Sequence, residues 1–313
     1  MIRTTTLLLC CVILGSSSSL NAQRRALHGP VVIPFELSER GHIFLRARVN
    51  NSEPLWFILD SGSGDTVLDK RLVDKLKLRV EGEGEAAGGG GSQVAVLTTG
   101  VSLEVAGVRL PRQDLPAIDF QALEKSIGRE IDGMLGYDFI RRFVIEVDYE
   151  ALTMKIHNAA GYQYSGRGQI MPITTENDHP HVNLTVKIPG RETLSGKFIV
   201  DGGAGGVTLE FSNAFVESHK LLESVTILET KSLPAIGGTH IIDYARGESI
   251  QIGKLRLTNP IIGFSQTARG SQNKPNIAGL IGTKFLRRFT VIYDDARKRI
   301  IFEPNGSFAT PEP

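Results

Sequence analysis

Two short segments carry residue types that could do acid–base chemistry, FILDSGS at 57–63 and FIVDGGA at 198–204. In each segment an apolar run ends abruptly on an aspartate, which is followed by small residues. The apolar run predicts a buried strand, so Asp60 and Asp201 are expected at strand ends, where the backbone turns. Two carboxylates placed equivalently, once per half of the chain, can meet across a pseudo-twofold axis and activate a water molecule.

The glycines of the two turns, Gly62 and Gly203, let the backbone approach a partner closely. Because the apolar runs bury each turn, the carboxyls of Asp60 and Asp201 are expected in a low dielectric. Two carboxyls within hydrogen-bond reach cannot both ionise readily, so they share one proton. One acid then deprotonates a water while the other protonates a carbonyl oxygen under attack.

A second repeated segment indicates that the chain is internally duplicated. The segment IDGMLGYDFIRRF at 131–143 matches IAGLIGTKFLRRF at 277–289, and it follows the first acid turn at nearly the distance seen in the second half. Two matches in the same order favour a duplication of two units. Each half therefore contains an acid turn and a later glycine in an apolar segment, Gly136 or Gly282.

The remaining pattern is mostly β, with two halves related by a pseudo-twofold axis, each a β-barrel-like lobe with short helices. A polar segment rich in small residues, 157–169, separates two predicted domains, 28–158 and 168–305. Strands are predicted where β-branched and aromatic residues concentrate, at 42–49, 55–60, 101–110, 143–148, 181–188, 197–201, 248–257 and 289–294. Short helices are predicted at 69–78, 119–129 and 212–224.

On these motifs the chain resembles the retropepsin-like and pepsin-like aspartic proteases, in a bacterial, exported, two-lobed form. DSGS at 60–63 fits the family motif, and Gly136 and Gly282 fit its later apolar-apolar-Gly segments. The resemblance covers about residues 28–305. It implies the bilobal acid-protease fold, an endopeptidase with Asp60 and Asp201 as catalytic acids, and a peptide or protein substrate. It implies no metal and no organic cofactor, because the nucleophile is water.

The resemblance also gives roles to the other turn residues. Ser61 and Ser63 would orient the carboxylate of Asp60, Gly62 and Gly203 would let the turns meet, and Ala204 completes the second motif. Gly202 departs from the family, which has Thr or Ser there to lock the two turns together. One lost hydrogen bond costs about 0.5–1.5 kcal/mol, but a shift of about an ångström in the site reduces rate about a hundredfold. The alternative function is therefore a catalytically weakened peptide-binding protein of the same fold.

The family closes a hairpin, the flap, over its bound peptide. Two glycine-rich stretches, 84–96 and 234–244, could supply it, and the sequence leaves open whether one or both do.

The run GGGG at 88–91 lacks the Lys-Ser/Thr of a phosphate loop. DHPH at 178–181 is more typical of a strand entry than of a metal site. Asp132 is expected on the surface, because Ala278 matches it. Helix-capping or solvated positions are expected for Arg141, Arg142, Arg287 and Arg288.

Residues 1–22 have the pattern of a secretory signal peptide, with Arg3, the apolar run LLLCCVILG and then SSSSLNA. Export to the periplasm or the exterior is therefore expected, without stable membrane insertion, because the apolar run is too short to span a bilayer. Cys10 and Cys11 would leave with the signal, so no disulfide is expected. The net charge of +1 provides no basic field for nucleic acid. A monomer is expected, with a homodimer of pairing halves left open.

Overall fold

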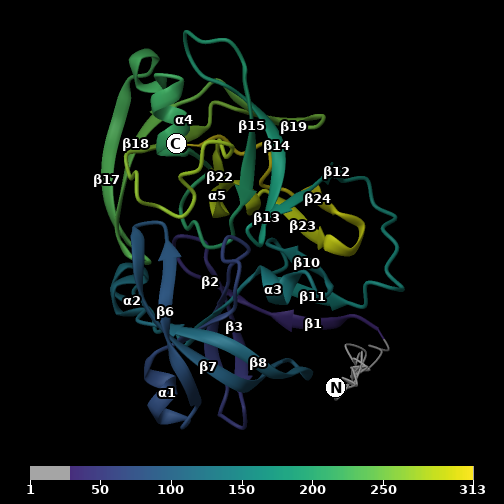
Figure 1. Ribbon diagram of the computed structural model, residues 1–313. Helices are drawn as coiled ribbons and strands as arrows, with labels where there is room; N and C mark the ends of the chain where they lie inside the picture. Colours follow the sequence, from purple (N-terminus) through teal and green to yellow (C-terminus); the bar gives the residue numbers. More distant parts are fainter. Residues whose placement is uncertain (1–28, 313) are drawn as a thin grey trace, which may run out of the picture.

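The computed structural model describes residues 29–312, and the predicted signal peptide at 1–22 lies outside them. The fold is mostly β with a few short helices, as predicted, and it is consistent with an acid-protease fold. The two halves of the chain lie one above the other in Figure 1, with β10 (Val144–Asp148) and β23 (Phe289–Asp294) at their junction. Within the described residues, no helix has the length and apolar character needed to cross a membrane.

A six-stranded sheet contains strands from both halves. Its two central strands are antiparallel partners, with Val144 of the first half opposite Asp294 of the second. Three strands precede residue 158 and three follow residue 168, so the sheet connects the halves. Its order is β1 (Val31–Pro34), β11 (Thr153–His157), β10 (Val144–Asp148), β23 (Phe289–Asp294), β24 (Arg299–Pro304) and β12 (Gln169–Pro172). The predicted domain boundaries themselves stay a prediction.

Each half repeats one arrangement around its acid turn. The strand before the first turn, β4 (Leu55–Leu59), runs parallel to β9 (Gly133–Leu135), with Leu59 opposite Leu135. In the second half β15 (Leu194–Val200) runs parallel to β22 (Gly279–Ile281), with Val200 opposite Ile281. Strands β3 (Ile43–Val49), β5 (Val67–Asp69), β14 (His179–Lys187) and β16 (Leu209–Phe211) complete the pattern. Apolar runs buried on both faces explain why β4 and β15 lack an alternating pattern.

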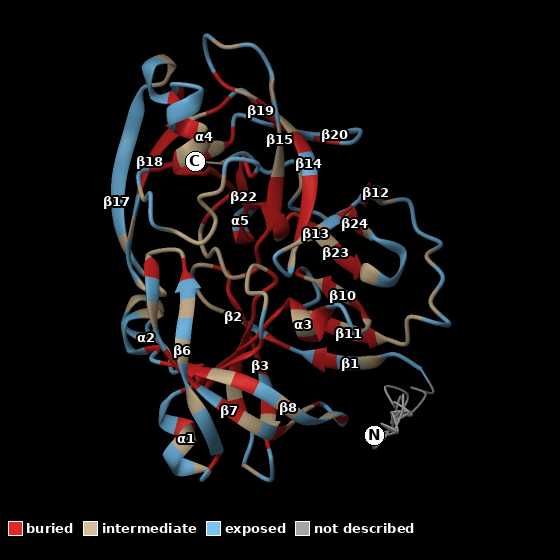
Figure 2. Ribbon diagram, in the orientation of Figure 1, coloured by how far each residue is buried: buried red, intermediate tan, exposed pale blue. Residues whose placement is uncertain are grey.

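A long β-hairpin projects from each half. The first consists of β6 (Arg79–Gly88) and β7 (Gly91–Val105), and the second of β17 (Ile227–Ala235) and β18 (Gly238–Arg246). Strand β17 is exposed along most of its length, as Figure 2 shows. The other strands are β2 (Glu36–Leu37), β8 (Val108–Ile118), β13 (Thr174–Glu176), β19 (Ser249–Ile252), β20 (Leu255–Thr258) and β21 (Ile261–Ser265).

The helices are short. They are α1 (Arg71–Lys75), α2 (Gln121–Ile127), α3 (Tyr137–Ile140), α4 (Asn213–Ser218) and α5 (Thr283–Leu286), with 3-10 turns η1 (Leu221–Ser224) and η2 (Asp295–Arg297). The three predicted helices correspond to α1, α2 and α4 with η1. Both α3 and α5 begin directly after the glycine of an apolar-apolar-Gly segment, where the chain leaves β9 or β22.

Two of the predicted strands each consist of two strands joined by a turn. In 101–110, β7 ends at Val105 and β8 begins at Val108, around Ala106 (φ 47) and Gly107 (φ 84). In 248–257, β19 and β20 are separated by a turn at Gly253 (φ 56). A two-residue turn adds an even number of positions, so the alternation of apolar residues continues through it and resembles one strand.

Asp132, expected on the surface, and Arg288, expected to cap a short helix or to be solvated, are both buried. Asp132 is 7% exposed, and its Oδ2 accepts the Trp56 N–H at 2.8 Å. Arg288 is also 7% exposed, and its Nη1 donates to the carbonyls of Phe308 and Thr310 at 2.9 and 2.7 Å. Both predictions were wrong because these partners lie far away in the sequence.

Candidate active site

The two acid turns are built in the same way. Each follows a strand whose parallel neighbour accepts the N–H of the aspartate, since Asp60 donates to Leu135 at 2.9 Å and Asp201 to Ile281 at 3.0 Å. The chain turns immediately afterwards, and both side chains stay inside the protein. Asp60 is 7% exposed and Asp201 is 5% exposed. The apolar runs that precede Asp60 and Asp201 therefore place both carboxyls in a low dielectric.

The two turns meet, and each glycine leaves room for the opposite carboxyl. A Cβ placed on Gly62 would lie 2.2 Å from Cγ of Asp201. A Cβ placed on Gly203 would lie 2.2 Å from Oδ2 of Asp60. No side chain fits at either position without moving an acid. The structure thus brings together the four residues that the two sequence motifs singled out, in a reciprocal arrangement.

The two carboxyls differ in how readily they ionise. Burial raises the pKa of Asp60 well above its usual value, and the charge of Asp201 raises it further, although the N–H groups of Gly62 and Ser63 oppose this shift. Burial also raises the pKa of Asp201, but hydrogen bonds from the N–H groups of Gly203 and Ala204 oppose this shift. These two donors lie 2.8 and 2.9 Å from Oδ1 of Asp201. The arrangement favours a proton on Asp60 and a negative charge on Asp201.

Ser61 links the two turns. Its Oγ donates to the carbonyl of Val200 at 2.7 Å and accepts the N–H of Gly202 at 3.0 Å. The hydroxyl of Tyr293 lies 3.2 Å from the same oxygen. Gly202 contributes only its N–H to this link, as the sequence implied. The lock between the turns is therefore present but one-sided.

The serines of the first turn have other partners than expected. The sequence assigned Ser61 and Ser63 to orienting the carboxylate of Asp60, but Oγ of Ser63 donates to the carbonyl of Asp65 at 2.7 Å. Oδ1 of Asp60 accepts the backbone N–H of Gly62 at 2.8 Å. Backbone donors hold this carboxyl, which leaves the hydroxyls for nearby carbonyls.

The two later glycines lie behind the acid turns. A Cβ on Gly136 would lie 2.3 Å from the backbone of Asp65, and one on Gly282 would lie 2.5 Å from the carbonyl oxygen of Ala204. The next residues bond back to the turns, because Tyr137 donates its N–H to Ser63 at 2.7 Å and Thr283 to Ala204 at 3.0 Å. Each apolar-apolar-Gly segment therefore supports the acid turn of its own half.

A histidine that the sequence did not mark supports the second turn. His42 is buried, and a Cβ on Gly205 would lie 2.1 Å from its Cε1. Burial and the charge of Arg40 lower the pKa of His42 to about 4. The carbonyl of Arg40 accepts the N–H of Gly206 at 2.7 Å and the hydroxyl of Thr283 at 2.8 Å. Residues 40–42 of the first half thus hold the turn of the second. A single histidine outside any motif gives no signal of this contact.

Both glycine-rich stretches are hairpin tips, and the tips touch. Gly238 pairs with Gly91, and the N–H of Gly90 donates to the carbonyl of Ile236 at 3.0 Å. A Cβ on Gly237 would lie 2.2 Å from the carbonyl carbon of Gly91, so only glycine permits this approach. In Figure 1 the second hairpin descends from the upper half to meet the first at the left. Both halves therefore contribute a hairpin.

The hairpins border a cleft of about 650 Å³ that contains both acids. Small and apolar side chains such as Ala87, Leu97 and Leu233 line part of it. A histidine–carboxyl hydrogen bond also faces it, with Glu210 Oε1 2.7 Å from His240 Nε2. Across residues 29–312, no three His, Cys, Asp or Glu side chains are grouped so that they could hold a metal ion.

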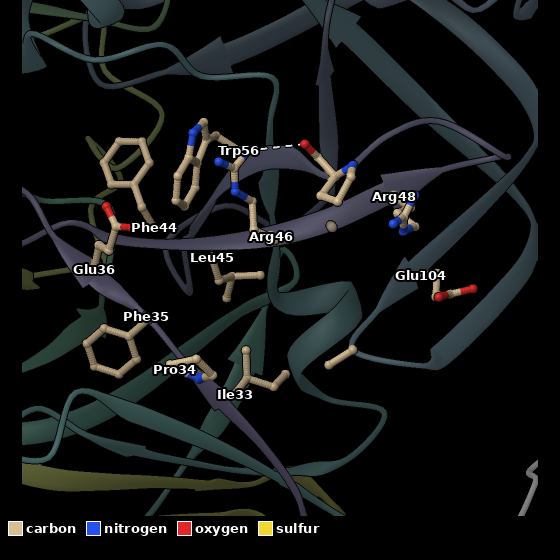
Figure 3. Close-up of a pocket in the computed structure, with 13 residues that line it drawn as sticks. Ile33, Pro34, Phe35, Glu36, Phe44, Leu45, Arg46, Arg48, Trp56 and Glu104 are labelled. Atoms are coloured by element: carbon tan, nitrogen blue, oxygen red, sulfur yellow. Dashed lines mark hydrogen bonds between the residues drawn. The ribbon is translucent and has the colours of Figure 1, made fainter.

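A second hollow, of about 490 Å³, lies on the outer side of β3 (Figure 3). Its main feature is Trp56, whose ring centroid is 3.4 Å from the guanidinium of Arg46 and 4.0 Å from that of Arg129. Arg46 also donates to the carbonyl of Pro54 at 3.1 Å, the dashed line of Figure 3. The Trp56 ring and the two guanidinium groups thus already interact with one another. The hollow includes neither acid, so the cleft is the candidate active site.

Comparison with known proteins gives one family match. Residues 45–139 match the model of a family described as aspartyl protease. The match supports an aspartic protease family, a hydrolase of the protease type and, with these, a peptide substrate. It covers less than a third of the chain and includes only the first acid turn. No curated protein matches the chain.

Proposed function

We propose that the protein is an aspartic endopeptidase whose single chain supplies both catalytic acids, Asp60 and Asp201. The observation that carries the proposal is the reciprocal fit of Gly62 against Asp201 and of Gly203 against Asp60. Carboxyls packed this closely share a proton, and that is the logic of aspartic proteases in general. The family match at residues 45–139 supports the same reaction class.

The proposed mechanism uses the different ionisation of the two acids. A water between them gives a proton to the carboxylate of Asp201 while its oxygen attacks the peptide carbonyl carbon. Asp60 gives its proton to the carbonyl oxygen, which forms a tetrahedral diol. When the diol collapses, the C–N bond breaks and a proton passes from the carboxyls to the departing nitrogen. No cofactor takes part in these steps.

The hairpins have a part in this mechanism as well. In this mechanism the contact between Gly90 and Ile236 opens to admit a peptide to the cleft. When the tips meet again, they cover the peptide and exclude water other than the nucleophile. The proposal assigns the complete site to a monomer, because one chain provides both acids and both hairpins. Export to the periplasm or the exterior belongs to the proposal, on the pattern of residues 1–22.

The test is cleavage of a peptide library between acid and neutral pH by the wild type and by Asp60→Asn and Asp201→Asn. Each substitution should lower cleavage by about 10³-fold or more, because both steps of proton transfer need both acids. Asp119→Asn, on the exposed surface, is the matched control and should cleave like the wild type. Undiminished cleavage by Asp60→Asn would exclude the proposed mechanism.

The alternative function, a peptide-binding protein with a weakened site, rests on Gly202. Binding of pepstatin, a transition-state mimic, separates the two. An active dyad should bind it far more tightly than it binds a substrate peptide. A wild type that binds peptides without cleaving them, and that shows no preference for pepstatin, would favour the alternative.

A further inference from the structure

A third segment of the second half reaches the acids. The loop 266–276, between β21 and β22, carries Gln272, whose Nε2 donates to Oδ2 of Asp201 at 3.1 Å. Because Oδ1 of Asp201 accepts the N–H groups of Gly203 and Ala204, this carboxylate receives donors on both oxygens. Within residues 29–312, Asp60 receives no comparable side-chain amide. The loop therefore breaks the symmetry of the pair.

We infer that Gln272 is a positioning residue, whose amide holds the ionised carboxylate on Asp201 and thereby leaves the shared proton on Asp60. The inference rests on the proposed function. A hydrogen bond to an ionised acceptor is stronger than one between neutral groups, and it stabilises the charged form. Neither sequence motif includes Gln272, and nothing in its sequence surroundings marks it.

The first hairpin holds this loop in place. The N–H of Ser271 donates to the carbonyl of Gly88 at 3.0 Å. A Cβ on Gly270 would lie 2.9 Å from the carbonyl oxygen of Gly89, so the loop lies directly against the hairpin tip. Gln272 is the next residue after this contact. Closure of the first hairpin therefore helps to place the amide on Asp201, and opening removes that support.

The other end of the loop is fixed within the second half. Oδ1 of Asn273 accepts the N–H of Ala214, at the start of α4, at 2.6 Å. Nδ2 of Asn273 donates to the carbonyl of Ala268 at 2.9 Å, which closes the loop on itself. Gln272 thus lies between a fixed anchor and a contact that depends on the hairpin. This arrangement connects the state of the hairpin to the state of the acids.

Other groups that act on Asp201 come from three directions. Asp60 faces it from the first turn, His179 acts on it from β14 when protonated, and Lys274 lines the cleft from the same loop. Tyr293 of β23 lies behind the turns and reaches Ser61. All of these groups remain when Gln272 is replaced. A comparison of variants at this position therefore isolates the amide.

The test is the pH profile of kcat/KM for Gln272→Met, which keeps the length of the side chain and removes the donor. We expect about a tenfold loss and a shift of the acid limb to higher pH by about one unit, because the Asp201 carboxylate loses a hydrogen bond. Gln272→Glu should regain activity only at acid pH, where a protonated glutamate can donate. Gln251→Met, at an exposed glutamine of β19, is the matched control.

Gly270→Ala tests the role of the hairpin. The added methyl should separate the loop from Gly89 and move the acid limb in the same direction as Gln272→Met, by a smaller amount. A merely structural role for Gln272 would lower thermal stability in both variants and leave the acid limb in place. An unchanged limb, or a gain of activity in Gln272→Met, would overturn the inference.

A second measurement does not depend on cleavage. In a double-mutant cycle, Gln272→Met should lower the Tm of the wild type more than it lowers the Tm of Asp201→Ala, which has no carboxylate to hold. Equal effects in both backgrounds would overturn the inference. Absence of cleavage by the wild type would instead overturn the proposed function, so the two failures are distinguishable.

Discussion

The two acid turns, 60–63 and 201–204, have the same backbone arrangement but different hydrogen-bond donors around their carboxyls. Each aspartate bonds to a parallel neighbouring strand, and each glycine leaves 2.2 Å between a placed Cβ and the opposite carboxyl. The hydrogen-bond donors differ, because the N–H groups of Gly62 and Ser63 act on Asp60, whereas Asp201 receives those of Gly203 and Ala204 and also the side-chain amide of Gln272. The two turns therefore share what brings the acids together and differ in what decides which acid ionises.

The supports across the two halves differ as well. Ser61 of the first turn reaches the backbone of the second, while Gly202 has no side chain to reach back. The second turn instead receives His42 and the carbonyl of Arg40 from the first half. The second turn therefore keeps contacts from the first half, although Gly202 has no side chain.

Among the tests of this comparison, the largest effect should come from removing the space that the turns share. Gly62→Ala and Gly203→Ala each place a methyl group inside the opposite carboxyl, which must move by an ångström or more. Cleavage should fall at least about a hundredfold in both variants, as measured by kcat/KM. Gly82→Ala, where no atom lies within 4 Å of the added Cβ, is the matched control. A large difference between the two variants would show that the turns are not equivalent.

Stability against pH should distinguish the two acids. The pKa of Asp60 is raised in the folded protein, so above pH 4 the folded state holds a proton that the unfolded state has lost. The free energy of unfolding therefore falls as pH rises through this window, by at most about 1.4 kcal/mol per pH unit. Asp60→Asn should remove this fall and be more stable than the wild type at pH 7.

Asp201→Asn should give a smaller gain, because its carboxylate has more donors to lose. Burial lowers the pKa of His42 to about 4, so its protonation destabilises the fold as pH falls from about 6.5. That contribution has the same sign in every variant and cancels in the comparison. Thermal unfolding of both variants and the wild type from pH 4 to 7 measures the difference. Equal gains in the two variants would contradict the assigned asymmetry.

The smallest effect should come from restoring the missing half of the lock. A Cβ on Gly202 lies 3.2 Å from the carbonyl oxygen of Leu59, so a serine hydroxyl there can donate to it, as Ser61 donates to Val200. Gly202→Ser should stabilise the protein by about 0.5–1.5 kcal/mol, while Ser61→Ala should destabilise it by about 1–3 kcal/mol. Chemical denaturation measures both. A destabilised Gly202→Ser variant would mean that the turns have no room for a second lock.

The strands and the acids could be predicted from the sequence because their signals are local. Apolar runs that end on Asp60 and Asp201 predicted β4 and the end of β15 within a residue, although β15 begins three residues earlier than predicted, at Leu194. The repeat identified Gly136 and Gly282. The same local reasoning was wrong at 101–110 and 248–257, where two-residue turns keep the alternation in phase. It was also wrong for Asp132, whose partner Trp56 is far away in the sequence.

The rest of the site depends on contacts between distant segments. His42 contacts the second turn because it stands directly before β3, which places it there. Gln272 reaches Asp201 because the first hairpin and Asn273 hold its loop. Neither residue belongs to a motif. The sequence also left open whether one hairpin or two cover the cleft. A glycine-rich stretch allows both mobility and close contact, so its composition does not decide between them.

The sequence alone determined that this chain contains two buried strand ends, each with an acid and a glycine. Apolar runs and glycine turns act on neighbouring residues, so the local order of residues is sufficient to specify them. Only the tertiary structure decided that the acids face each other, that Asp201 has more hydrogen-bond donors than Asp60, and that both hairpins meet above them. Those properties depend on distances and burial between segments far apart in the chain, which take definite values only when the two halves pack.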